Sequence, residues 1–106
     1  MYMLCMYNSP MIESFADDTT SDIYNGLDTR HARRIPLQLH PVVRRKLDYL
    51  EVARTLDDLR VPPGNRLEAL KGDQRGRYSI RVNDQYRITF RFERDTATEV
   101  RCEDYH

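Results

Sequence analysis

The stretch that decides the fold is RYSIRVNDQYRITFRF, residues 77–92. Apolar and polar residues alternate along both of its halves, and a period of two is typical of half-buried β-strands. The turn-forming residues Asn83-Asp84-Gln85 separate the two halves. The stretch therefore predicts an antiparallel hairpin that has one apolar face and one polar face.

The length of the loop sets the register of this hairpin. A two-residue loop would pair Arg81 with Tyr86 and would move Arg87 onto the apolar face. A three-residue loop pairs Val82 with Tyr86 and keeps the apolar side chains together. We therefore predict the three-residue loop, whose other apolar pairs are Ile80 with Ile88 and Tyr78 with Phe90.

Four arginines meet on the polar face in this register. Arg81 lies opposite Arg87, and Arg77 lies opposite Arg91. Like charges directly across a ladder are destabilising, whereas guanidinium groups bind the oxygens of a phosphodiester bidentately. The polar face of the hairpin therefore indicates a surface that binds an anion.

Composition limits the class of protein. A chain of 106 residues, 40% of them hydrophobic and 32% charged, is expected to form one soluble domain, and it holds no apolar run long enough to cross a membrane. Its two cysteines make neither a disulfide framework nor a metal site, so we expect reduced thiols in a cytoplasmic protein without a cofactor. We predict one domain over residues 11–106, preceded by an extension over residues 1–10 that lies upstream of a natural start at Met11.

The charge distribution is uneven along the chain. The formal net charge is zero, yet all 17 lysines and arginines follow Thr29. Such asymmetry indicates either a local basic surface or an ordinary mixed one. The basic segment over residues 29–36 is open to the same two interpretations, a solvated loop or a loop that attracts phosphate or a partner.

Two helices are predicted before the hairpin, after a first strand over residues 11–15. Asp17 and Asp18 can cap a helix that runs to about Tyr24 and stops near Gly26. Pro41 suits the first turn of a second helix. In that helix an apolar stripe recurs at Val43, Leu47 and Leu50, which leaves Arg44 and Arg45 outside.

Two further strands complete the prediction. Residues 66–70 form a short strand candidate, and residues 97–104 form the last strand. One allowed register of the last strand sets Glu103 beside Arg87 and Glu99 beside Arg91, which would supply counter-charges. The fold class is therefore α+β, with two N-terminal helices packed on a small antiparallel sheet.

The chain contains no phosphate-binding loop, nucleophile elbow or zinc signature. Because RNA carries its own nucleophile, the 2′-hydroxyl, its cleavage needs positioning, charge stabilisation and proton transfer but no metal. The residues that could supply these are basic or lie near the basic cluster in the sequence: Glu68, Lys71, Arg77, Arg81, Arg87, Arg91, Asp104, Tyr105 and His106. Additional RNA contacts are predicted at Arg44, Arg45 and Arg75.

Each of these residues also has a structural interpretation. Glu68 would pair only with Arg66 or Arg75, and Arg77 and Arg91 would pair with Glu99. Tyr105 would tie down the end of the chain, and His106 would be frayed. The residues alone leave an RNA-cleaving site and a non-catalytic anion-binding or regulatory surface equally open.

Three blocks together resemble a known family. MIESFAD, RVPPGNRLEALKGDQRGRYSIRVNDQYRITFRF and the terminal EDYH are similar to the HigB toxins of bacterial type II toxin–antitoxin modules, in the RelE superfamily. The resemblance implies a microbial-ribonuclease-like fold and a metal-independent endonuclease that cuts messenger RNA on the ribosome. It also implies a HigA-type helix-turn-helix antitoxin, through which alone the toxin would reach operator DNA.

The resemblance also assigns roles to positions of this sequence. Lys71 matches the lysine that contacts the transition-state phosphate, and Arg81 and Arg87 match the arginines that hold the scissile and neighbouring phosphates. Asp104, Tyr105 and His106 match the terminal motif, in which the tyrosine orients a base and the histidine shuttles a proton.

One position departs from the pattern. Some HigB toxins have a histidine where this chain has Glu68. We expect this carboxylate to act as the general base, as in other microbial ribonucleases, or the substitution to slow cleavage.

Overall fold

The computed structural model describes residues 12–104. The predicted extension over residues 1–10 and the predicted site residues Tyr105 and His106 lie outside the described residues. Within the described range, helices come first and strands follow. The α-helices are α2 (Asp18–Tyr24) and α3 (His40–Val52), and the strands are β1 (Glu68–Ala69), β2 (Arg77–Arg81), β3 (Tyr86–Glu93) and β4 (Thr96–Asp104).

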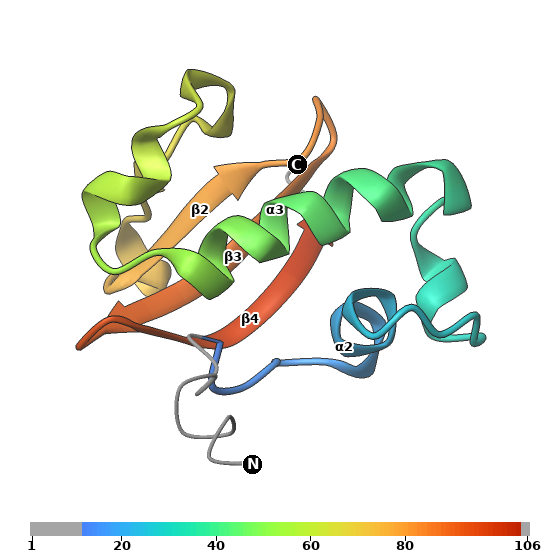
Figure 1. The fold of residues 1–106 in the computed structure, drawn as a ribbon. Helices are drawn as coiled ribbons and strands as arrows, with labels where there is room; N and C mark the ends of the chain where they lie inside the picture. Colours follow the sequence, from blue (N-terminus) through green and yellow to red (C-terminus); the bar gives the residue numbers. More distant parts are fainter. Residues whose placement is uncertain (1–11, 105–106) are drawn as a thin grey trace, which may run out of the picture.

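The four strands form one antiparallel sheet in the order β1-β2-β3-β4. Each strand therefore pairs with its neighbour in the sequence, as in a meander. Figure 1 shows α3 lying across one face of this sheet, with α2 near β4. The α+β class with an antiparallel sheet is confirmed for the described range.

The register predicted for the central hairpin is confirmed. Arg77 lies opposite Arg91, Arg81 lies opposite Arg87, and Ile80 lies opposite Ile88. The amide of Val82 donates to the carbonyl of Tyr86 at 3.0 Å, which closes the predicted three-residue loop. The alternation of polar and apolar residues was therefore sufficient to set this register.

The pairing of β3 with β4 contains a bulge that the sequence did not reveal. Arg87 lies opposite Glu103 as expected, but Arg91 lies opposite Thr98 because the register shifts between Thr89 and Arg91. Glu99 has a φ of 51°, in the left-handed region, and is the residue displaced by the bulge. Its side chain still reaches Arg91, at 3.3 Å from Nε.

Two predicted strands were wrong in extent. Residues 12–15 form no strand, only single bridges from Ile12 to Ala97 and from Phe15 to Val100, because the bulge interrupts the edge of β4 on which a continuous ladder would form. The candidate over residues 66–70 shrinks to β1, since Arg66 has a φ of 47° and a left-handed residue cannot continue a strand.

Both helices follow their capping signals. Asp17 caps α2 by accepting from the amide of Thr20 at 2.9 Å, and Gly26 follows the helix with a φ of 75°. Pro41 lies in the first turn of α3. His40 is buried at the start of that helix, where its Nε2 lies 2.9 Å from the carbonyls of both Ala32 and Ile35.

The core lies between α3 and the apolar face of the sheet. The predicted stripe of α3 is fully buried, as are Ile80, Ile88 and Phe90 of the hairpin. Cys102 is also buried there as a free thiol, and burial raises its pKa to about 12. α3 therefore covers the apolar face of the sheet, and the four arginines of the hairpin lie on the opposite face.

Replacing Leu47 by alanine should lower the free energy of unfolding by about 2–5 kcal/mol, because the fully buried side chain leaves a cavity. Urea denaturation followed by circular dichroism measures this change. Val52→Ala is the matched control on the same helix, since Val52 is 70% exposed and its loss should cost less than about 0.5 kcal/mol. Equal losses in the two variants would contradict the packing described for α3.

Candidate functional site

The face of the sheet opposite α3 is built by alternate residues of the central strands. Because Arg77 pairs with Arg91, Ser79 with Thr89 and Arg81 with Arg87, these side chains share one face. Glu68 of β1 joins them opposite Ser79, and Glu103 of β4 joins them opposite Arg87. We call this surface the arginine face; its members are Glu68, Arg77, Ser79, Arg81, Arg87, Thr89, Arg91 and Glu103.

Arg87 is the most firmly held cation on the arginine face. It is 6% exposed, its Nε donates to Oγ of Ser79 at 2.8 Å, and its Nη2 donates to the carbonyl of Arg66 at 2.7 Å. The same Nη2 lies 3.5 Å from Oε1 of Glu68. Fixed acceptors on two sides hold the guanidinium plane, so little side-chain entropy remains to be lost when an anion binds.

The carbonyl that holds Arg87 is positioned by a buried polar pair. Asn65 is fully buried and donates through Nδ2 to the carbonyl of Leu59 at 3.1 Å. Its Oδ1 accepts from Nζ of Lys46 at 2.6 Å. These bonds fix the loop that ends in the left-handed Arg66, whose carbonyl then faces Arg87.

The role of Lys46 was missed from the sequence. The apolar stripe placed Arg44 and Arg45 outside and assigned no position to Lys46, which is only 7% exposed. Burial lowers the pKa of its ammonium group, and the positive charges of Arg45 and Arg81 lower it further. The helical stripe contained the only signal, because Lys46 lies three residues after Val43 and therefore on the same side of α3.

Arg81 lies opposite Arg87 and is more accessible. Its side chain is 33% exposed, and Nη2 bonds to Oδ1 of Asp84 in the hairpin loop. Asp84 itself is almost fully exposed. A carboxylate in solvent is displaced from an arginine at low cost, so Arg81 can exchange this partner for a phosphate.

Glu68 lies beside the fixed guanidinium. The predicted alternative partners, Arg66 and Arg75, do not make its ion pair; Arg87 does. The Glu68 side chain is 53% exposed, so it is accessible to a ligand from solvent. The structure therefore brings Glu68, Arg81 and Arg87 to the same end of the arginine face.

Of the remaining predicted catalytic residues, Asp104 lies at this end of the sheet, whereas Lys71 follows Leu70, whose amide bonds to the carbonyl of Arg77 at the other end. Lys71 follows β1 with an exposed side chain that makes no hydrogen bond or ion pair within residues 12–104. Asp104 ends β4 opposite Tyr86 and accepts from Nε2 of Gln85 at 3.0 Å. The catalytic roles of both residues stay predictions.

Arg77 and Arg91 have the partner predicted for them as supporting charges. Nη1 of Arg77 lies 3.2 Å from Oε1 of Glu99, and its Nη2 donates to Oγ1 of Thr89 and to the carbonyl of Glu99. Only 11% of its side chain is exposed, compared with 41% for Arg91. Arg77 therefore fastens the bulge of β4 to β2, while Arg91 retains an accessible side.

Three other predicted RNA contacts lie elsewhere or stand alone. Arg44 and Arg45 belong to α3, which covers the opposite face of the sheet; Nη1 of Arg44 reaches the carbonyl of Ile23 at 3.4 Å, and Arg45 is exposed. Arg75 is exposed in the segment before β2. Their contacts with RNA stay predictions.

Among residues 12–104, no group of three or more His, Cys, Asp or Glu side chains has the arrangement of a metal site. No helix in that range is both long and apolar enough to cross a membrane.

Replacing Arg77 by alanine should lower the free energy of unfolding by about 1.5–3 kcal/mol, because it removes charged hydrogen bonds from a nearly buried group. Thermal or urea denaturation measures the loss. Arg75→Ala is the matched control two residues away, where the side chain is exposed and the expected change is below about 0.5 kcal/mol. An unchanged free energy of unfolding in Arg77→Ala would contradict the structural role of Arg77 and leave only its predicted role in binding RNA.

The fold has a counterpart among solved structures. The structure resembles the YoeB–YefM complex from Staphylococcus aureus, with a TM-score of 0.58 and 15% sequence identity, over 90% of this chain and 97% of that chain. At this level of identity the likeness concerns the fold alone.

Sequence comparisons identify the family. The family described as the RelE-like toxin of type II toxin–antitoxin system HigB matches residues 13–106. The chain is 44% identical to Toxin HigB-1 of Vibrio cholerae over 77% of this chain and 84% of that protein. It is 41% identical to an uncharacterized protein of Haemophilus influenzae over 83% of this chain and 85% of that protein. The chain therefore belongs to the HigB-like toxins, the RelE-like toxins of type II toxin–antitoxin systems.

Proposed function

We propose that this toxin is a metal-independent endoribonuclease that cuts messenger RNA on the ribosome and so inhibits translation. The observation that carries the proposal is the fixed guanidinium of Arg87 opposite the accessible Arg81, on a sheet face that α3 leaves uncovered. Two arginines on adjacent strands present donors from a rigid sheet, and such donors suit the non-bridging oxygens of a phosphodiester.

Charge development in the reaction matches these positions. As the 2′-oxygen attacks phosphorus, negative charge grows on the phosphoryl oxygens, and preorganised cations stabilise it. Arg81 and Arg87 hold the phosphate, and Lys71, whose exposed ammonium makes no ion pair within residues 12–104, neutralises the developing charge. Because Arg87 is already held by Ser79 and Arg66, it needs no reorganisation during the reaction.

Proton transfer requires two groups. Glu68 or His106 takes the proton of the 2′-hydroxyl as the 2′-oxygen bonds to phosphorus. The bond between phosphorus and the 5′-oxygen then breaks, and a second group protonates that oxygen. The products are a 2′,3′-cyclic phosphate and a 5′-hydroxyl. Glu68 suits the role of base because it lies at the edge of the phosphate site, 3.5 Å from Nη2 of Arg87.

The partner of this toxin is an antitoxin, as membership of a type II toxin–antitoxin family implies. We propose a HigA-type helix-turn-helix protein, through which the complex reaches operator DNA. We also propose that the ribosome supplies part of the geometry of the messenger RNA, and that Tyr105 orients a base in that setting.

Induction of the toxin in a bacterial host should arrest growth and create new 5′ ends in translated messenger RNA. Lys71→Ala, Arg87→Ala and Tyr105→Ala should each lower the rate of cutting by about 100-fold or more, because each removes a group that binds or orients the transition state. Mapping of 5′ ends after a short induction measures the rate. Arg54→Ala, at an exposed arginine after α3, is the control that should cut like the unaltered toxin.

Folding must be separated from chemistry at the buried position. Arg87→Lys keeps the positive charge but loses the guanidinium group that bonds to Ser79 and Arg66. An Arg87→Lys toxin that is folded should therefore cut messenger RNA more slowly than the unaltered toxin. Undiminished arrest in all three alanine variants would show that the site is elsewhere. Growth arrest without new 5′ ends would contradict cleavage. It would support the non-catalytic alternative, in which the protein binds RNA through the same face without cutting it.

A further inference from the structure

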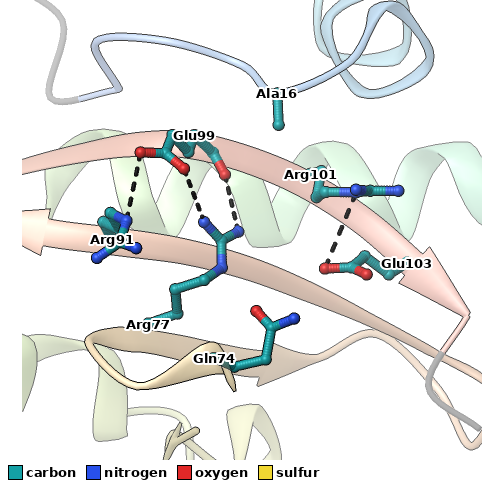
Figure 2. A pocket seen from close by; sticks show the side chains of 7 residues that line it. All are labelled: Ala16, Gln74, Arg77, Arg91, Glu99, Arg101 and Glu103. Carbon is teal, nitrogen blue, oxygen red and sulfur yellow. Dashed lines mark hydrogen bonds and ion pairs between the residues drawn. The ribbon is translucent and has the colours of Figure 1, made fainter. Parts of the chain in front are cut away.

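A second feature of the arginine face lies beyond the Arg81–Arg87 pair. A hollow of about 280 Å³ opens next to Arg77 and Arg91, at the other end of the face. Figure 2 shows the lining: Arg77 and Glu99 lie on the side of Arg91, Arg101 and Glu103 lie across from them, and Gln74 lies below. The proposed phosphate site uses none of these side chains.

The base of the hollow is rigid and its rim is adaptable. The guanidinium of Arg77 is bonded to Glu99 and Thr89, so it presents a fixed plane. Gln74 is exposed, and its side-chain amide makes no hydrogen bond within residues 12–104. Arg101 is 47% exposed, and its Nε lies 3.7 Å from Asp17 and 3.9 Å from Glu103, which is beyond hydrogen-bond distance.

The mixture of donors and acceptors indicates the chemistry of the ligand. Arg91 and Arg101 offer N–H donors, Glu103 offers a carboxylate, and the Gln74 amide offers both a donor and an acceptor. A phosphate has only acceptor oxygens and would be repelled by Glu99 and Glu103, whereas the edge of a nucleobase presents donors and acceptors together. Unstacked bases of single-stranded RNA also stack on guanidinium planes, and Arg77 supplies such a plane.

The position of the hollow fits a nucleotide beside the cut. Arg91 lies four residues from Arg87 along β3, a separation of about 13 Å at the rise of an antiparallel strand. Glu103, which lines the hollow, lies opposite Arg87 across β3 and β4, so the hollow borders the proposed phosphate site. An RNA strand that runs along the sheet from Arg87 toward Arg91 would pass the hollow.

We infer that this hollow is a nucleobase-binding subsite that reads one nucleotide flanking the scissile phosphate, with Gln74 and Arg101 contacting the edge of the base and Arg77 stacking beneath it. The inference rests on the proposed function, since it assumes that RNA lies along the arginine face. It assigns the sequence preference of cutting to side chains that do no chemistry.

The test uses the full-length toxin, purified without antitoxin, and a short RNA made uncleavable by 2′-O-methylation. One nucleotide at a time is replaced by an abasic nucleotide, and fluorescence anisotropy measures the affinity. Removing the base at a single position should weaken binding to the unaltered toxin by about tenfold, the contribution of one stacked base. In Gln74→Ala and Arg101→Gln, the same abasic replacement should change the affinity less than threefold.

Two control variants and a second measurement separate the outcomes. Gln38→Ala and Arg54→Ala, at exposed positions of η2 (Leu37–Leu39) and after α3, should keep the full abasic effect. Equal affinities across the abasic series, unchanged sensitivity in Gln74→Ala and Arg101→Gln, or no measurable binding of any RNA would overturn the inference. Mapping of 5′ ends tests cleavage separately. Base-selective binding without new 5′ ends would contradict the proposed function but not the subsite. New 5′ ends without base-selective binding would contradict the subsite but not the proposed function.

Discussion

Two pairs of arginines face each other across β2 and β3. The register that buries Ile80, Ile88 and Phe90 also sets Arg81 against Arg87 and Arg77 against Arg91. Each pair is unfavourable alone, so the surrounding chain supplies acceptors. Glu99 reaches Arg77 and Arg91 because the bulge in β4 displaces it toward them, while Glu68, Ser79 and the carbonyl of Arg66 hold Arg87.

The arginines of the two pairs have different kinds of partner. The partners indicate which arginines hold the protein together and which are available to bind a ligand. Arg77 directs its bonds into the protein, to Thr89 and to the backbone and side chain of Glu99. Arg81 is joined to a carboxylate that is itself exposed, so its partner is exchangeable. Arg87 is fixed by the hydroxyl of Ser79 and the carbonyl of Arg66, and it lies 3.5 Å from the half-exposed carboxylate of Glu68. A cation fixed in this way suits the preorganised phosphate site that we propose.

The sequence predicted those features that depend on local pattern. The hairpin register followed from alternation, and both helices began and ended near their capping residues, Asp17 and Pro41. The bulge at Glu99 could not be predicted, because a left-handed glutamate has no sequence signature and is held by its bond to Ser14 and by Arg77. The burial of Lys46 was hidden for a similar reason, since its partner Asn65 comes from a loop 19 residues later.

The site was predictable only in part. The hairpin register predicted which arginines share a face, but it did not predict the acceptors that orient Arg87, because a serine inside a strand and a backbone carbonyl carry no recognisable pattern. The comparisons identify the toxin family, and the physical arrangement adds which cation is fixed and which is exchangeable. Neither Lys71 nor Asp104 is given a catalytic role by its contacts within residues 12–104.

Arg87 and Arg81 together form the phosphate site that we propose. Nuclear magnetic resonance of the arginine Nε–H groups tests this site directly, with an uncleavable 2′-O-methyl dinucleotide as the ligand. We expect the Nε–H signal of Arg87 to be protected from exchange in the free toxin, because this group donates to Ser79. On titration, the signals of Arg81 and Arg87 should shift first and together. A rapidly exchanging Arg87 signal, or shifts confined to arginines outside the sheet such as Arg45 and Arg54, would contradict the account.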